Sequence, residues 1–457
     1  MILFGVVLLG SGCAHTELSP SGSAADADAI RTAFVVRGEG NRAIARVITD
    51  APACPALLID GTPRGMVERV SPATYPARSG NGLDGKEVAF PVRTCERTLP
   101  STVTTLRVGA IDLPVPKAAI QRIVIVADTG CRLKQSESAY QDCNDARKWP
   151  FARIADQAAA LHPDLVIHIG DLHYRESPCP ATHPGCAASP WGYGFDTWKA
   201  DFFDPAKTLL TAAPWVFVRG NHESCWRAGQ GWFRFFDARP WSAARSCNQP
   251  AFDTDADYSE PYAVKLTPAT QLIVFDSSRS GSKANRPDEL IFQKYLQQLR
   301  QVAELATQAP HNFFVNHHPV LGLGGSRDGL TAKPGSEGLQ SVMQVAHPGR
   351  LFAPQVDLAL HGHVHLFEAL GFSSDHPATL VLGNSGSAME GRLPASLPPD
   401  TFPAPGAAVN TFATQDDFGF ASLDRNGDDW TLSEWNVDGQ LVIRCELHGP
   451  ALSCPAR

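Results

Sequence analysis

The sequence predicts an α/β protein, with sheets flanked by helices, that is preceded by a small all-β domain. Two sequence patterns support this prediction. Between about residues 33 and 117, short β-type runs alternate with Gly- and Pro-containing turns, which is typical of a β-sandwich. After residue 120, apolar strands alternate with helix-like segments, as they do in α/β domains. At 457 residues, the chain is long enough for two or three such units.

The composition excludes several classes of protein. Charged residues make up 19% of the chain, against a usual ~25%, which excludes a coiled coil and a highly charged disordered protein. The hydrophobic content of 43% can supply a sizeable core. The net charge of −8 provides no broad basic field, so we expect no binding to duplex nucleic acid and no electrostatic attraction to acidic lipid.

Residues 1–13 are predicted to be an export signal of the lipoprotein type. An apolar stretch from Ile2 to Gly12 ends in small residues before Cys13, and it is far shorter than the ~20 residues that span a bilayer. Cys13 is therefore the candidate for lipidation, with ordinary secretory cleavage or a buried strand as alternatives. The protein would then be periplasmic, extracellular or membrane-anchored, and it would meet a membrane only through the lipid. Residues 14–32 are small and polar, as expected of a linker.

The cysteines point to an oxidising compartment. The chain has 11, and setting Cys13 aside leaves an even number suited to disulfides. Connectivity cannot be derived from sequence, but the cysteines fall into pairs that are close along the chain. The favoured pairs are Cys54–Cys95, Cys131–Cys143, Cys179–Cys186, Cys225–Cys247 and Cys445–Cys454.

The second domain is predicted to span residues 118–457, with a core at 120–390 and C-terminal β-hairpins at 411–457. A helix is predicted to open at Pro287, because apolar residues recur from Phe292 to Ala306 at three-to-four spacing. Hairpin turns are expected at Asn426-Gly427 and at Asp438-Gly439. Buried strands are predicted at 123–127, 165–169, 215–218, 272–275, 312–315, 356–360 and 379–382.

Residue types that bind metals follow five of these strands directly. Open α/β sheets build their sites just beyond the carboxyl ends of strands, so these side chains are expected to meet. Each motif is weak by itself, since Asp-x-Gly and Gly-Asp also occur in ordinary turns. Their recurrence in order is what predicts a site. The five segments are Asp128-Thr129-Gly130, Gly170-Asp171-Leu172-His173-Tyr174, Gly220-Asn221-His222-Glu223, Asn316-His317-His318-Pro319 and His361-Gly362-His363-Val364-His365.

This ordered set resembles the calcineurin-like metallophosphoesterases, and the resemblance covers residues 120–390. Most members have a metal-binding His where this chain has Gly130. Tyr174, three residues after Asp171, resembles the purple acid phosphatase branch, in which a tyrosinate replaces that His. The resemblance implies two metal ions that share Asp171. It implies one site of Asp128, Asp171, Tyr174 and His365, and another of Asp171, Asn221, His317 and His363.

The ligand types also indicate which metals each site would prefer. Phenolate and carboxylate oxygens favour Fe(III) at the Tyr174 site, whereas two imidazoles and an amide suit Zn(II), Fe(II) or Mn(II) at the other. By the same resemblance, His222 is the general acid that protonates the leaving group. Weaker candidates for supporting the site or contacting substrate are His318, Glu223, Arg132, Arg175 and Asn384.

The function predicted from sequence is a binuclear phosphoester hydrolase of the acid phosphatase type. It would cleave small-molecule phosphomonoesters by attack of a metal-bound hydroxide. One alternative is a phosphodiesterase or nucleotidase on the same fold. Another is a non-catalytic surface protein that retains the metals for stability. The sequence carries no readable code for the physiological substrate or the oligomeric state.

Overall fold

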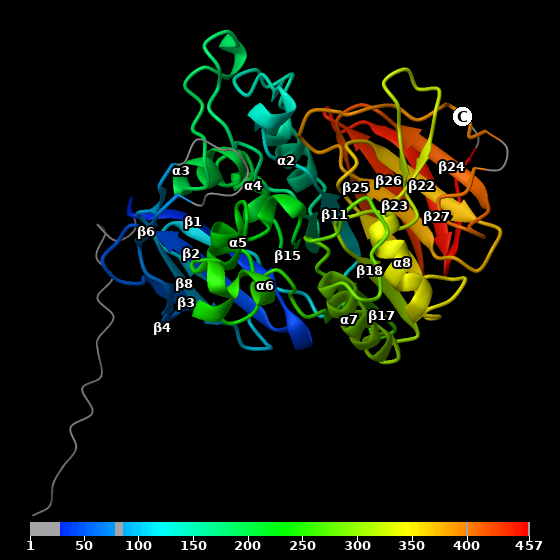
Figure 1. The fold of residues 1–457 in the computed structure, drawn as a ribbon. Coiled ribbons are helices and arrows are strands. Elements are labelled where there is room, and N and C mark those ends of the chain that lie inside the picture. Colours follow the sequence, from blue (N-terminus) through cyan, green and yellow to red (C-terminus); the bar gives the residue numbers. More distant parts are fainter. Residues whose placement is uncertain (1–27, 78–85, 399–400, 456–457) are drawn as a thin grey trace, which may run out of the picture.

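The structure is a computed structural model that describes residues 28–77, 86–398 and 401–455 (Figure 1). The predicted signal segment, Cys13 and most of the predicted linker lie outside the described residues. Among the described residues, no helix has the length and apolar character needed to cross a bilayer.

Two large sheets form the centre of the described chain. The first is 11-stranded and the second is 7-stranded within the described ranges. In spatial order, the strands of the first sheet are β28 (Ala451–Ser453), β27 (Leu441–His448), β26 (Asp429–Asn436), β25 (Gly419–Asn426), β11 (Arg122–Val126), β14 (Leu165–Ile169), β15 (Trp215–Val218), β1 (Ile30–Arg37), β2 (Ala43–Thr49), β8 (Arg93–Thr98) and β5 (Val67–Val70). Those of the second are β16 (Tyr262–Lys265), β17 (Thr270–Val274), β18 (His311–Val315), β21 (Val356–His361), β23 (Ala378–Leu382), β22 (Phe367–Phe372) and β24 (Val409–Gln415).

Smaller sheets and the helices complete the fold. A four-stranded sheet contains β10 (Ile111–Leu113), β9 (Leu106–Val108), β3 (Ala56–Ile59) and β4 (Thr62–Gly65). The two-stranded sheets pair β12 (Leu133–Lys134) with β13 (Ala139–Tyr140), β19 (Leu323–Gly324) with β20 (Lys333–Pro334), and β6 (Ala73–Tyr75) with β7 (Val88–Phe90). The helices are α2 (Phe151–Ala160), α3 (Phe195–Trp198), α4 (Lys207–Leu210), α5 (Gly229–Phe235), α6 (Asp253–Ala256), α7 (Leu290–Ala306) and α8 (Glu337–Ala346).

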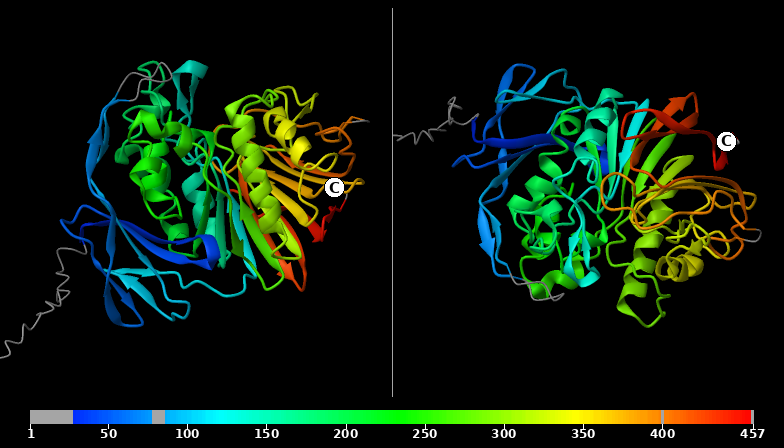
Figure 2. Two further views of the ribbon diagram at one scale, coloured as in Figure 1. Left: turned by 60° about the horizontal axis from the view of Figure 1, so that its bottom comes forward. Right: turned by 90° about the horizontal axis from the view of Figure 1, so that it is seen from above.

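The two large sheets pack face to face and helices cover their outer faces (Figures 1 and 2). Strand β11 contributes side chains to both layers of this packing. Ile123 and Ile125 enter the core between the sheets, while Val124 and Val126 enter the core beneath α2 and α5. Successive side chains of a strand point to opposite faces, so a strand buried on both sides is continuously apolar. Helices α7 and α8 cover the second sheet. The predicted α/β fold with helix-flanked sheets is confirmed.

Most predicted elements coincide with observed ones, and one helix start differs. The seven predicted buried strands correspond to β11, β14, β15, β17, β18, β21 and β23. The predicted hairpin turns join β25 to β26 and β26 to β27. Helix α7 begins at Leu290 rather than at Pro287, because Glu289 has an extended backbone and its carboxylate accepts a hydrogen bond from the Arg286 amide at 2.8 Å.

The N-terminal region is all-β, but it shares a sheet with the rest of the chain. Strand β1 pairs with β2 and also runs parallel to β15, where Val36 lies opposite Trp215. The sandwich-like packing is present, since β1, β2 and β8 bury a common core against the four-stranded sheet. Strands from both sides of the boundary expected near residue 117 therefore belong to one sheet. Consequently, β15, the strand before Asn221, is flanked on both sides.

Five disulfides join the same pairs that sequence proximity favours: Cys54–Cys95, Cys131–Cys143, Cys179–Cys186, Cys225–Cys247 and Cys445–Cys454. Such a number is typical of proteins from oxidising compartments. The second, third and fourth of these bridges constrain loops that follow Asp128, Tyr174 and Asn221, respectively.

Candidate metal centre

The predicted ligands gather where the two large sheets face each other. Strands β11, β14 and β15 are mutually parallel, and so are β18 and β21. Their carboxyl ends therefore point to one edge of the molecule, where all seven predicted ligands lie. Those ligands are Asp128, Asp171, Tyr174, Asn221, His317, His363 and His365.

Three of these ligands have backbone conformations that are uncommon for residues with side chains. The φ angles of Asp128, Asp171 and His363 are 54°, 56° and 69°. Left-handed conformations cost free energy in non-glycine residues and concentrate at functional sites. At each of the three positions this conformation turns the backbone sharply away from the preceding strand, which directs the side chain toward the centre.

Gly130 explains how Tyr174 reaches the site. A Cβ atom at position 130 would lie 2.8 Å from both the Leu172 carbonyl oxygen and the Tyr174 amide nitrogen. That is closer than real Cβ contacts, so a larger residue would displace the segment that carries Tyr174. The two departures from the common family pattern are thus sterically linked.

The Tyr174 hydroxyl lies at the centre of the first group of candidate ligands. Its Oη is 2.8 Å from Asp128 Oδ1 and 3.0 Å from Asp171 Oδ2. The Nε2 atom of His365 lies 2.8 Å from the same oxygen. All four side chains are buried. A phenol, two carboxylates and an imidazole therefore converge on one small volume.

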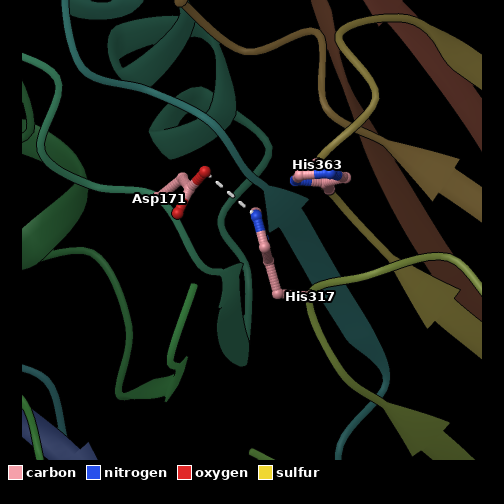
Figure 3. Close-up of side chains that lie close together, drawn as sticks. All are labelled: Asp171, His317 and His363. Carbon is pink, nitrogen blue, oxygen red and sulfur yellow. Dashed lines mark ion pairs between the residues drawn. The ribbon is translucent and has the colours of Figure 1, made fainter. Parts of the chain in front are cut away.

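The second group is formed by Asp171, His317, His363 and Asn221. Figure 3 shows the first three, and the dashed line joins His317 Nε2 to Asp171 Oδ2, which are 3.0 Å apart. The ligand atoms of these three residues all lie within 4.8 Å of one another. Asn221 Oδ1 lies 3.1 Å from His317 Nε2 and 3.1 Å from His363 Nδ1. The amide oxygen therefore faces two imidazole nitrogens, and a cation between them could bind all three atoms.

Backbone carbonyls set the orientation of two imidazoles. The Nδ1 atom of His317 bonds to the Ile169 carbonyl oxygen at 2.7 Å, and that of His365 bonds to the Ala388 carbonyl oxygen at 2.7 Å. A carbonyl can only accept, so each Nδ1 carries a proton, and each ring in its neutral form would present the lone pair of Nε2 to the centre. Metal-binding histidines are usually held by such contacts.

Both aspartates divide their oxygens in the same way. Asp171 Oδ1 accepts from the His222 amide at 2.8 Å, and Asp128 Oδ2 accepts from the His363 amide at 2.9 Å. The other oxygen of each carboxylate faces the centre. Asp171 Oδ2 is the atom that contacts both Tyr174 of the first group and His317 of the second. One oxygen thus lies between the two groups of ligands.

The electrostatics of the centre fit positive ions. Burial and the carboxylates of Asp128 and Asp171 raise the pKa of Tyr174 well above its usual value. Burial lowers the pKa of His317, but Asp171 and Asp128 outweigh it and raise that pKa to about 9. Uncompensated negative charge therefore dominates the site. Bound cations reverse this balance and stabilise phenolate and neutral imidazole, so the residues present fit two metal ions.

Glu223 holds together the loops that carry the candidate ligands. Its Oε2 accepts from the Asp171 amide at 2.9 Å and the Gly220 amide at 3.0 Å. Its Oε1 accepts from the Leu172 amide at 2.9 Å and the His173 amide at 3.2 Å. Four backbone donors on one fully buried carboxylate fix the loop after β14 against the loop after β15.

His222 is buried beside the centre, and two residues that sequence reasoning missed surround it. Its Nδ1 lies 3.1 Å from Glu176 Oε1, and Arg227 Nη2 lies 2.6 Å from both ring nitrogens. Burial and the charge of Arg227 lower the pKa of His222 to about 4, against the opposing effects of Asp171 and Glu176. The only signal in the sequence was the short separation of Glu176 from Tyr174 and of Arg227 from His222.

The weaker candidates from sequence have other partners. Arg132 forms ion pairs with Glu137 and Glu390. Arg175 is buried, pairs with Asp201 at 2.6 Å and stacks on Trp149, so it is a structural residue rather than a substrate contact.

Asn384 is also buried, and it donates a hydrogen bond to Glu434 at 2.8 Å. It therefore does not lie at the rim of the site. His318 does lie at the centre, with its ring 4.3 Å from that of His363. Burial and the neighbouring histidines lower its pKa, which keeps it neutral.

A cavity of about 400 Å³ opens beside the second group of ligands. Asn221, His318 and His363 line its inner end. Its outer walls come from residues 280–282, 319, 322–324 and 334–336. Larger cavities, of about 570 and 1030 Å³, contain none of the candidate ligands. The cavity at the centre has the size of an ordinary small-molecule site.

The two sheets face each other between layers of helices, and candidate oxygen and nitrogen ligands lie at the ends of their parallel strands. This combination is that of a metallophosphoesterase. A family model described as calcineurin-like phosphoesterase matches residues 121–367, more than half of the sequence. The chain belongs to the calcineurin-like phosphoesterase family.

Known proteins similar to this chain include purple acid phosphatases. A protein of Arabidopsis thaliana named "probable inactive purple acid phosphatase 24" is 23% identical over 274 residues, which cover 59% of this chain and 39% of that protein. The chain thus matches less than half the length of that relative. A purple acid phosphatase, PPD1, from yellow lupin (Lupinus luteus) seeds has a similar fold, with a TM-score of 0.50, 15% identity, and coverage of 90% of this chain and 72% of that one. The structure of PhoD gives a TM-score of 0.51 with 10% identity, covering 93% and 92%.

Proposed function

We propose that this protein is a binuclear metal-dependent hydrolase of phosphomonoesters. The position of Asp171 Oδ2 carries the proposal, because that oxygen contacts both Tyr174 and His317 and could bridge two ions. The first ion would be held by Asp128, Asp171, Tyr174 and His365, and the second by Asp171, Asn221, His317 and His363. When bound, the two ions would supply electrophilic stabilisation of the phosphate and an acidified nucleophilic water.

The protein's own residues orient these groups and handle the proton. Glu223 and the backbone amides of His222 and His363 fix the carboxylates, so little reorganisation accompanies reaction. His222 is not among the ligand set, and its Nε2 lies 3.8 Å from Asp171 Oδ2. From this position its imidazolium form would donate the Nε2 proton to the departing alkoxide as a general acid.

The cavity favours a substrate with a single phosphate. Among its described lining residues there is no Lys or Arg, and serines, glycines and prolines predominate. Further phosphates on a nucleotide would need cations to neutralise them. An uncharged polar leaving group matches serine side chains such as Ser280, Ser282 and Ser336.

Initial rates on p-nitrophenyl phosphate, its bis-ester and ATP test this proposal. The metal-loaded protein is expected to hydrolyse the monoester fastest. Faster cleavage of the bis-ester or of ATP would favour the phosphodiesterase or nucleotidase alternative. A fully metallated protein that cleaves none of them would instead be a non-catalytic metal protein. The name of the Arabidopsis relative, "probable inactive purple acid phosphatase 24", is consistent with that alternative.

We also propose that the ion at Tyr174 is Fe(III) and that its partner is Zn(II), Fe(II) or Mn(II). Phenolate and carboxylate oxygens suit a hard trivalent ion. A phenolate on Fe(III) absorbs visible light by charge transfer, so the protein should be violet or pink.

Tyr174→Phe is expected to abolish this colour while iron remains bound by the other three ligands. The visible spectrum and elemental analysis, measured on the same sample, check this result. Tyr140→Phe is the matched control, because it removes a phenol from a half-buried tyrosine outside the ligand set. If the colour persisted in Tyr174→Phe, another group would be the source of the absorption.

We further propose that the protein is exported and that Cys13 is lipidated. The five disulfides among the described residues support export. Mass spectrometry of the mature N-terminus would identify the processing site and any attached lipid.

A further inference from the structure

A buried ion pair lies directly behind His222. Glu176 and Arg227 are 51 residues apart in sequence, and the Nε atom of Arg227 donates to Glu176 Oε1. Their exposed fractions are only 2% and 8%. Burying both charges has a desolvation cost that often exceeds their attraction, and apolar residues of similar size could replace them without loss of stability. A contribution to stability therefore does not explain why this ion pair is buried here.

Glu176 sets the direction of the His222 ring. Its Oε1 lies 3.1 Å from His222 Nδ1, and a carboxylate at this distance accepts the Nδ1 proton and stabilises the imidazolium form of the ring. In that form the other nitrogen, Nε2, also carries a proton and faces the centre, 3.8 Å from Asp171 Oδ2. Glu176 thus stands to His222 as an orienting group stands to a catalytic base or acid.

Arg227 connects this pair to the candidate ligand Asn221. Its Nη2 contacts the His222 ring, and its Nη1 lies 2.9 Å from the outer atom of the Asn221 amide. Once Asn221 directs its oxygen inward to a cation, that outer atom is the amide nitrogen, which is a donor like Nη1. Arg227 then needs acceptors elsewhere. The Tyr193 hydroxyl, which shares a hydrogen bond with Arg227, is one, and a phosphate oxygen of the substrate has the right charge to be another.

We propose that Glu176 is a positioning residue for His222 and that Arg227, held by Glu176, contacts the substrate phosphate. This inference rests on the proposed hydrolase function. The charges of Glu176 and Arg227 compensate each other, so the pair adds direction to the site without adding net charge. His222 is thereby fixed for proton donation to the leaving group.

The test of Glu176 compares two substrates that differ in their need for an acid. Dinitrophenolate leaves without protonation, whereas the alkoxide of glycerol phosphate needs a proton. For Glu176→Gln we expect kcat on glycerol phosphate to fall about 10- to 100-fold, part of the ~10²–10⁴ that a positioned acid contributes. On dinitrophenyl phosphate we expect a change of less than about 3-fold, and KM should change little.

Metal content separates positioning from a structural role. Elemental analysis of Glu176→Gln should give the metal stoichiometry of the unaltered protein. Glu304→Gln, the same substitution at an exposed position of α7, is the control and should change neither rate. An equal fall on both substrates, or a loss of metal, would overturn the role assigned to Glu176. Inactivity of the unaltered protein on every ester would instead refute the proposed function.

The test of Arg227 measures binding rather than turnover. Calorimetric titration of the metal-loaded protein with inorganic phosphate should show about 10-fold weaker binding in Arg227→Met, as expected for loss of a charged hydrogen bond. Unchanged affinity would contradict the phosphate contact. If Glu176→Gln does not fold, Glu176→Asp provides the second variant. It keeps the negative charge beside Arg227 but withdraws the carboxylate from His222 Nδ1, and it should show the same selective loss on glycerol phosphate.

Discussion

Asp171→Asn is expected to release both metal ions and to abolish hydrolysis. The substitution removes the negative charge of the one oxygen that contacts both ligand groups, those of Tyr174 and His317. An amide cannot hold two cations as a carboxylate can. Because metals contribute several kcal/mol to such reactions, we expect kcat/KM to fall by at least about 10³-fold.

The polypeptide fold should survive this change. Asn tolerates the left-handed backbone that position 171 requires, with φ of 56°, better than most residues. Its amide oxygen can still accept the hydrogen bond from the His222 backbone. The far-ultraviolet circular dichroism should therefore be unchanged, while the melting temperature should lose the contribution of metal binding.

Elemental analysis of purified Asp171→Asn is the deciding measurement, with Asp156→Asn on an exposed face of α2 as its control. The control should retain both ions and full activity. If Asp171→Asn retained one ion and lost the other, Asp171 would belong to a single site. If both ions remained at full occupancy, the bridging assignment would be wrong.

The sequence predicted the elements of this site because each ligand follows an apolar strand directly. Burial on both faces makes strands such as β11 and β14 almost entirely apolar, with His168 as an exception in β14, so the polar residues that follow them mark their ends. Asp128 and Asp171 occupy those positions. The parallel order of the strands then brings segments together that are far apart in the chain.

Contacts made across the fold could not be predicted in the same way. Glu176 and Arg227 lie in irregular loops, and only the tertiary structure brings them to His222. Arg175 was a candidate for contacting substrate because its partner, Asp201, gives no signal in the sequence.

Similarly, no local pattern indicates that β1 pairs with β15 across nearly 180 residues. The β-type character of residues 33–117 was evident, but the sheet to which they belong was not.

His222→Ala is expected to retain both metal ions and to lower kcat by ~10²–10⁴ on an alkyl phosphate. His222 is outside the ligand set, and the hydrogen bond to Asp171 comes from its backbone amide, which alanine keeps. Glu176 and Arg227 can remain paired with each other after the imidazole is removed. The ligand geometry should therefore persist while the proton donor is lost.

The same variant distinguishes a proton donor from a residue that merely fills space. A donor matters only when the leaving group needs a proton, so the loss in His222→Ala should nearly disappear on dinitrophenyl phosphate. His448→Ala, which removes an exposed imidazole from β27, should leave both rates unchanged. If His222→Ala slowed both substrates equally with its metals in place, the ring would act on the phosphate itself. Near-normal turnover on glycerol phosphate would show that His222 has no part in the reaction. The positioning role proposed for Glu176 would then also be wrong.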